Sequence, residues 1–213
     1  MIMDLKGKVK LMNNAGKTTR EKLLFAAIDL FSEKGYEATT VEEIAASVGM
    51  KGPNVYNYFK GKKGLVDAID TLFKESYKEK MKLKECYAEP IQNAEDLKRF
   101  SMKTIRYTLN DEITRKLRRI ATMEQYKSDY FRGKVASNQH SNIIQFFTGL
   151  MARLMEQGKI KKCDPHILAL MYAAPVSQLI QIYDREPQRK REILKTAEAY
   201  VDLFIDTYFI KEQ

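Results

Sequence analysis

A short polar stretch around residue 55 carries the side chains best suited to contact a polyanion. Two asparagines and two tyrosines lie close together in it, and four lysines surround them with no acidic residue between Gly49 and Lys63. Amide and phenol groups can hydrogen-bond to base edges or phosphate oxygens, and lysines gain binding free energy by displacing the counterions of DNA. The pattern indicates a nucleic-acid contact made by Asn54, Tyr56, Asn57 and Tyr58, flanked by Lys51, Lys60, Lys62 and Lys63. The alternative is a solvated helix whose tyrosine pair packs internally.

Two short helices joined by a tight turn are predicted to present this stretch. Thr40 and Glu43 fit the capping box S/T-x-x-E, so a helix begins near Thr40. Apolar residues then recur at i, i+3, i+4 and i+7, and Gly49 ends the helix because glycine readily adopts positive φ. A second helix follows, which Val55 and Phe59 would anchor because they lie four residues apart. The turn between the two helices is about four residues long, which is typical of a helix-turn-helix.

Two longer helices are expected on either side of this pair, since helices this short cannot form a core alone. Thr18 and Glu21 make a second capping box, and the helix that they start ends at Gly35. After Gly61, another helix continues to about Glu85 and would connect the pair to the rest of the chain.

Helical periodicity continues to the C-terminus, without strand alternation, a Gly-rich phosphate loop or a repeat. Further helices are expected from Asn93, after Asn110, over about 134–157, from Asp164 and after Pro187. The prediction is an all-α fold of about nine helices. Its parts are a flexible arm (1–17), a three-helix helix-turn-helix domain (18–64) and a larger helical regulatory and dimerisation domain (65–213).

Composition and spacing argue against several other classes of protein. The net charge of +9 is spread along the chain, so the local lysine cluster is more informative than the total. No apolar run approaches the length of a bilayer span and no signal-peptide pattern opens the chain, which predicts a soluble cytoplasmic protein. Cys86 and Cys163 lack C-x-x-C spacing, and His140 and His166 lack a metal-binding partner at i+4. With no nucleophile and base or paired carboxylates at usable spacing, we expect neither an enzyme nor a bound metal or cofactor.

The segments TTREKLLFAAIDLFSEKGYEATTVEEIA and VGMKGPNVYNYFKGKKGL resemble the DNA-binding domain of the tetracycline-repressor (TetR) family of bacterial transcriptional regulators. The resemblance runs from Thr18 to about Ala68. It implies that Thr40 and Tyr56 contact phosphate and that Lys62 holds the DNA backbone. It also implies that the bases face Gly52, Pro53, Asn54, Asn57 and Tyr58. Many members carry a hydrogen-bonding side chain where Gly52 stands, which leaves Lys51 or the Gly52 backbone as substitutes.

The last two helices carry more apolar surface than packing on one side requires, which predicts self-association through a two-fold interface. The resemblance implies the same: a homodimer that places its recognition helices in successive major grooves of a pseudo-palindromic operator. Candidate interface residues are Leu179, Tyr183, Ala197, Tyr200, Val201, Phe204 and Tyr208. Core packing is the alternative for each of them.

The resemblance further implies a small-molecule effector that binds between the fourth and eighth helices and releases the DNA. Methionines and aromatic residues suit varied apolar ligands, and a phenol or amide can fix their orientation. The candidates are Met102, Tyr107, Met123, Tyr126, Phe147, Met151, Tyr172 and Gln178, with core packing again the alternative. The predicted function is a ligand-responsive transcriptional regulator that represses. The alternatives are a helical protein-interaction module without DNA binding and a ligand-insensitive repressor or activator.

Overall fold

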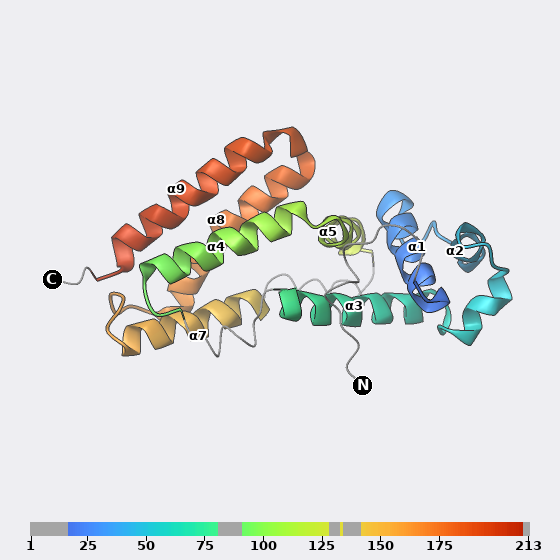
Figure 1. Cartoon of the computed structure of the whole chain (residues 1–213), viewed down its shortest axis with the longest axis horizontal. Coiled ribbons are helices and arrows are strands. Elements are labelled where there is room, and N and C mark those ends of the chain that lie inside the picture. The colour runs from blue at the N-terminus through green and yellow to red at the C-terminus, as the bar shows by residue number, and fades with distance from the viewer. Residues whose placement is uncertain (1–16, 81–90, 128–132, 134–141, 211–213) are drawn as a thin grey trace. The chain divides into compact units, whose positions relative to one another are not determined.

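The computed structural model describes residues 17–80, 91–127, 133 and 142–210 (Figure 1). Within these ranges the regular elements are helices, apart from an isolated bridge between Ile160 and Phe209, so the predicted all-α fold is confirmed. None of these helices is long and apolar enough to cross a bilayer. Residues 1–16 of the expected arm, Cys86 and His140 lie outside the described residues.

The chain divides into two compact units. The first comprises residues 1–84 and 116–123, and the second comprises residues 85–115 and 124–213. The helix that follows the helix-turn-helix therefore groups with the first unit, whereas the sequence placed it in the regulatory domain. The functional boundary at residue 64 stays a prediction.

The first unit is built from α1 (Thr19–Lys34), α2 (Val41–Ser47), the 3-10 helix η2 (Gly52–Asn57) and α3 (Gly61–Lys80). Both predicted capping boxes are formed, one starting α1 and the other starting α2. Helix α1 packs against α2 and α3, and α2 packs against η2. Their shared core contains Leu23, Leu24, Ala27, Ile28, Phe31, Ile44, Ala45, Val55, Phe59 and Leu65.

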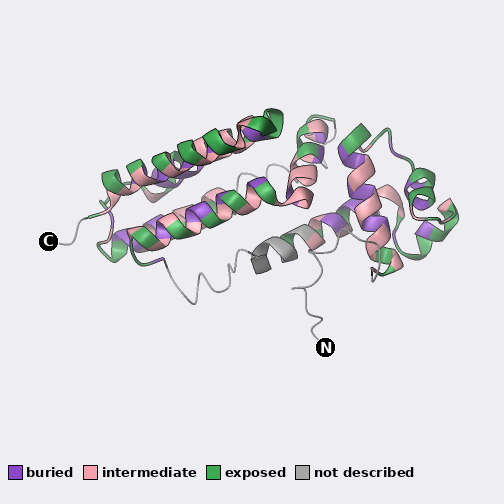
Figure 2. Ribbon diagram, turned by 45° about the horizontal axis from the view of Figure 1, so that its top comes forward, coloured by how far each residue is buried: buried purple, intermediate pink, exposed green. Residues whose placement is uncertain are grey.

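The second unit contains α4 (Ala94–Asn110), α7 (Asn142–Glu156), α8 (Pro165–Arg185), the 3-10 helix η4 (Pro187–Arg189) and α9 (Lys190–Tyr208). Helix α5 (Glu112–Glu124) is shared, because its residues 116–123 group with the first unit. In the second unit α7 packs against α8, and α9 packs against both α4 and α8 (Figure 1). Buried positions recur along one side of α4 and α9 (Figure 2), as an amphipathic helix requires.

A chain of aromatic contacts runs through the core of the second unit. The ring centroids of Phe147 and Tyr172 are 4.7 Å apart, those of Tyr172 and Phe204 are 4.8 Å apart, and those of Phe204 and Tyr208 are 4.9 Å apart. Burial raises the pKa of Tyr172 to about 12, and its hydroxyl hydrogen-bonds to Ser101. These rings therefore join α7, α8 and α9 into one packed body.

Candidate functional site

The second helix of the predicted pair is a 3-10 helix rather than a turn of α-helix. The Asn54 N–H donates to the Lys51 carbonyl at 3.0 Å, and the Tyr58 N–H donates to the Val55 carbonyl at 2.9 Å. Both bonds span three residues. Pro53 is in the first turn, where its missing N–H breaks no helical hydrogen bond, and 3-10 geometry is common in short segments of this kind.

Val55 and Phe59 hold this segment against the rest of the first unit, as the sequence predicts. Val55 is fully buried, Phe59 is 5% exposed, and the Arg20 guanidinium lies 4.9 Å from the Phe59 ring centre. Burying side chains of this size stabilises a fold by roughly 1.5–3 kcal/mol each. The two anchors leave the opposite face of η2 in solvent.

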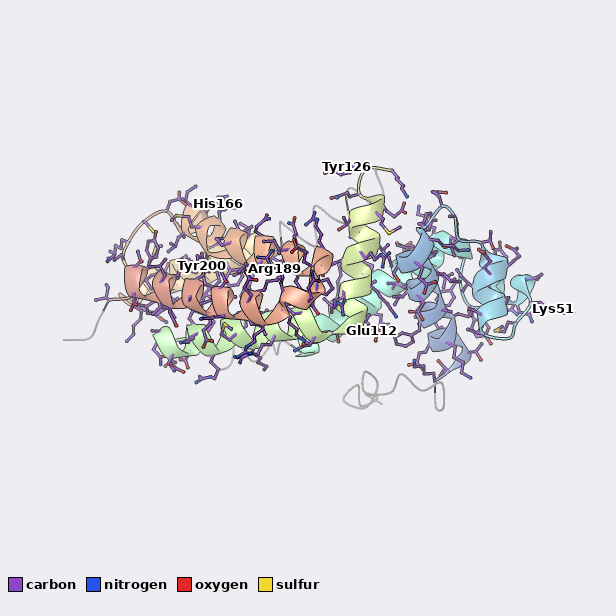
Figure 3. The ribbon with its side chains drawn as sticks, turned by 90° about the horizontal axis from the view of Figure 1, so that it is seen from above. Lys51, Glu112, Tyr126, His166, Arg189 and Tyr200 are labelled. Carbon is purple, nitrogen blue, oxygen red and sulfur yellow. The ribbon has the colours of Figure 1, made fainter. Side chains whose placement is uncertain are left out.

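That opposite face carries most of the predicted DNA contacts. Tyr56 is 61% exposed and Tyr58 is 41% exposed, which is unusual for large aromatic side chains. Lys51 lies at the outer end of the segment (Figure 3). The structure brings together the exposed residues Lys51, Pro53, Asn54, Tyr56, Asn57, Tyr58 and Lys60, and we refer to them as the η2 face.

Thr40 is exposed, but its polar groups are already used within its own turn. Its hydroxyl accepts from the Glu43 N–H at 3.1 Å and donates to the Glu43 carboxylate at 3.1 Å. Lys34 also bonds this carboxylate and, together with the Thr40 N–H, lowers the pKa of Glu43 to about 2. A phosphate could accept a hydrogen bond from the Thr40 hydroxyl only if it displaced the Glu43 carboxylate.

Lys62 points into the first unit. Its Nζ donates to the Tyr36 carbonyl at 2.8 Å and to the Glu37 carbonyl at 3.3 Å, and it lies 4.4 Å from the centre of the Tyr36 ring. The side chain is partly buried. Lys62 therefore ties the start of α3 to the turn between α1 and α2, a role that the sequence did not reveal because the partners lie more than twenty residues away.

The space beside Gly52 is taken by Glu42, which no sequence pattern indicated. A Cβ atom placed on Gly52 would lie 3.2 Å from Glu42 Cγ and 3.3 Å from Glu42 Oε1. Glu42 is exposed on α2 and makes no hydrogen bond or ion pair with the residues that the structure describes. The missing side chain at Gly52 thus makes room for a carboxylate beside the η2 face.

Comparison with known proteins gives the same assignment for this unit. Residues 23–69 match the family model described as bacterial regulatory proteins, tetR family. The negative transcriptional regulator IcaR of the biofilm operon of Staphylococcus aureus is 44% identical over 48 residues, which are 22% of this chain and 26% of IcaR. The uncharacterised HTH-type regulator YhgD of Bacillus subtilis is 26% identical over 190 residues, which cover 85% of this chain and 94% of YhgD.

This part of the chain is a TetR-family DNA-binding domain.

The fold of the whole chain also has solved relatives. The complex of SmeT with triclosan superposes with a TM-score of 0.73 at 23% identity, over 92% of this chain and 93% of SmeT. At this identity the likeness concerns the fold. It spans both units, whereas the family model covers the first unit alone.

In the second unit, most of the predicted dimerisation residues lie in the core of a single chain. Tyr183, Ala197, Val201 and Phe204 are at most 4% exposed, and Leu179, Tyr200 and Tyr208 are partly buried. The Tyr200 hydroxyl donates to the Met171 and Tyr172 carbonyls, which ties α9 to α8. The exposed apolar side chains near these helices are different ones: Ile167, Leu170, Met171, Leu203 and Ile210.

The predicted effector-binding residues are distributed over two core clusters, the surface and both units. Phe147, Met151 and Tyr172 pack in one core cluster and Met102 in another. Tyr107 is partly buried on α4, Gln178 is exposed on α8, and Met123 belongs to the first unit. Tyr126 is 82% exposed just beyond α5 (Figure 3).

A cavity of about 310 Å³ does exist in the second unit, but other residues of α7 line it. The predicted effector residues of α7 were those of its apolar stripe, and this stripe faces the core. The described residues that line the cavity are Ile91, Asn142, Gln145, Phe146, Gly149, Leu150 and Arg153. The part of the chain that the structure describes has no group of three His, Cys, Asp or Glu side chains placed to hold a metal ion.

Proposed function

We propose that this TetR-family regulator is a repressor that binds a pseudo-palindromic operator as a homodimer and is released by a small molecule. The observation that carries the proposal is the η2 face. It gathers exposed amides, phenols and lysines on one side of a short helix whose other side is anchored by Val55 and Phe59. Such a face offers direct readout of bases together with charge for phosphates.

The proposed homodimer is supported by the exposed apolar residues of α8 and α9. Met171 is 50% exposed on α8, and Leu203 is 64% exposed on α9. The two helices pack against each other, and a second copy of the same helices would cover these exposed side chains. An interface that uses the same patch on both chains has two-fold symmetry, and this would match a pseudo-palindromic operator.

Release by a small molecule is supported by the cavity beside α7 and by SmeT, which has the same fold and was solved with triclosan bound. An effector lowers DNA affinity when it binds better to a conformation that fits the operator poorly. Repression is supported by the name of IcaR, a negative regulator. A protein that acts on bacterial DNA works in the cytoplasm.

The decisive experiment is selection of bound sequences from random duplexes, followed by affinity measurements at several salt concentrations. We expect an enriched sequence with two inverted half-sites and an affinity that falls steeply with salt. An enriched sequence without dyad symmetry would contradict the dimer. A failure to retain any duplex at low salt would reject DNA binding itself.

Matched variants locate the contact surface. Lys51→Ala and Lys60→Ala each remove an exposed cation from the η2 face, and each should lower the slope of log K against log salt by about 0.9 if it contacts a phosphate. Lys103→Ala removes the same charge from an exposed position on α4 and should leave the slope unchanged. Tyr56→Phe removes one hydroxyl and should weaken binding without changing the slope. If all three lysine variants gave the same slope of log K against log salt, the DNA would not contact the η2 face.

A further inference from the structure

The cavity in the second unit is built on a single face of α7. Its lining positions on this helix recur at intervals of three, four and seven residues, so their side chains lie along one side. These positions are Asn142, Gln145, Phe146, Gly149, Leu150 and Arg153, and Ile91 completes the described lining from just before α4. The wall is apolar at Ile91, Phe146 and Leu150, and it carries one cation.

One donor atom of that cation has no acceptor among the described residues. The Nε atom of Arg153 is shut off from solvent and has no hydrogen-bond partner, and no ion pair of Arg153 occurs among the described residues. A cation in the last turn of a helix interacts favourably with the helix dipole. That interaction needs only the charge near the helix end, so it does not account for a buried donor without a partner. Buried donors without a partner are rare in folded proteins.

Gly149 provides a second, independent sign that the space beside α7 is kept open. It lies in the interior of the helix, where glycine is less favourable than alanine. A Cβ atom added there would meet no other atom within 4 Å, so close packing does not require the glycine. The absence of a side chain instead leaves room one turn away from Arg153.

We propose that this cavity binds a small apolar molecule with one carboxylate, whose oxygens accept hydrogen bonds from the two terminal nitrogens of the Arg153 guanidinium, since the Nε atom is shut off from solvent. The planar guanidinium fork matches the two oxygens of a carboxylate, while the apolar wall would hold the body of the molecule. The volume of about 310 Å³ is within the size range of small-molecule sites, which begins at about 300 Å³. Binding of such a ligand does not depend on the proposed function. Only its role as the effector rests on that proposal.

Octanoate and octanamide test the proposal as a matched pair, since they have the same chain length and number of non-hydrogen atoms but differ in charge. Titration calorimetry of the full chain at neutral pH should give at least tenfold tighter binding of octanoate. Arg153→Met keeps most of the apolar stem and removes the cation, so it should abolish this preference while octanamide still binds. Gly149→Leu fills the open space and should weaken both ligands, whereas Gly149→Ala should weaken them less.

Equal affinity of the wild-type chain for the two probes overturns the proposal, as does the absence of octanoate binding. An undiminished preference in Arg153→Met also overturns it. If Arg153→Met does not fold, the wild-type comparison and the two Gly149 variants decide the question. Operator binding is measured separately without ligand, so a chain that binds octanoate but no DNA contradicts the proposed function and leaves this inference standing.

Discussion

At the scale of single residues, the first unit separates side chains that hold its structure from side chains that face solvent. Lys62 is bound to two carbonyl groups of the turn between α1 and α2, whereas Lys60, two residues earlier, is exposed. Both are lysines of one cluster in the sequence. Only the positions of the Tyr36 and Glu37 carbonyls make their roles different.

Lys62→Met should destabilise the first unit by on the order of 1.5 kcal/mol, because two carbonyls lose a charged donor. Hydrogen exchange of the α1 and α2 amides would report the loss locally. Lys60→Met is the matched control and should leave this exchange unchanged. In DNA titrations we expect the opposite result. Lys60→Met should lower the slope of log K against log salt, and Lys62→Met should leave it unchanged. A lower slope for Lys62→Met would show that Lys62 contacts phosphate as well.

Glu43 makes the stability of α2 depend on pH. Its pKa falls from 4.5 to about 2 in the folded chain, first through the hydrogen bond from Lys34 and then through the Thr40 N–H. A lowered carboxylate pKa stabilises the fold above the unfolded value, and this contribution is lost as the pH falls through the folded value. The protection of α2 amides in the wild type relative to Glu43→Gln should therefore be greatest above pH 4.5 and should vanish towards pH 2.

Glu42→Gln is the control for this experiment, since it removes a carboxylate from the same turn without removing a cap. It should leave the protection of α2 at neutral pH unchanged. A loss of protection as large as that of Glu43→Gln would mean that general charge near α2, rather than the capping box, stabilises the helix.

Glu42 also bears on which bases are read. A carboxylate can accept a hydrogen bond from the amino group of cytosine but not from the acceptor edge of guanine. Gly52→Ala would place a Cβ atom 3.2 Å from Glu42 Cγ and should push this side chain aside. In duplex selections, Gly52→Ala and Glu42→Gln should therefore change base preference at the same operator position. Changes at unrelated positions would exclude a shared role.

At the scale of elements, α8 and α9 pack within the chain around Tyr172 and Phe204 and also leave apolar side chains in solvent. These are Ile167, Leu170 and Met171 on α8 and Leu203 on α9. Exposed apolar residues on neighbouring helices are typical of a surface that another chain covers. These exposed side chains are therefore the better candidates for the proposed dimer interface.

Met171→Glu and Leu203→Glu should weaken the proposed dimer at least tenfold, because a charge would be buried without a partner. Sedimentation over a range of concentrations would measure the change. Lys103→Glu places a new acid at an exposed position of α4, outside the two helices of the proposed interface, and should not alter association. Wild-type chains that stay monomeric at micromolar concentration would contradict the interface altogether.

At the scale of the whole molecule, the proposed regulation is a coupling between two binding events in different units of the chain. The η2 face lies in the first unit, and the cavity beside α7 lies in the second. Thermodynamic linkage requires that a ligand and an operator affect each other equally. This requirement holds whatever conformational change connects them.

If octanoate occupies the effector site, saturating octanoate should weaken operator binding by some factor, and saturating operator should weaken octanoate binding by the same factor. Fluorescence anisotropy of a labelled duplex and calorimetry would measure the two values. Octanamide should have a smaller effect on operator binding, in proportion to its weaker affinity. If octanoate binds without changing operator affinity, the cavity does not regulate DNA binding.

The sequence by itself determined the helices of this protein and the position of its helix-turn-helix. Capping boxes at Thr18 and Thr40 are interactions between residues three apart, and the apolar periodicity around Val55 is equally local. Signals of this kind do not depend on the rest of the fold. The all-α class and the exposed polar side of η2 could therefore be predicted.

Only the tertiary structure decided which face of each later helix is covered and which polar groups are already bonded. Periodicity finds an apolar stripe on α7 and α9, but whether a stripe meets its own chain or an open surface depends on distant helices. Phe204 and Met151 consequently belong to the core, while Leu203 and Arg153 face an open surface or a cavity. The bonds of Lys62 follow the same rule, because its partners approach only when the chain folds back on itself.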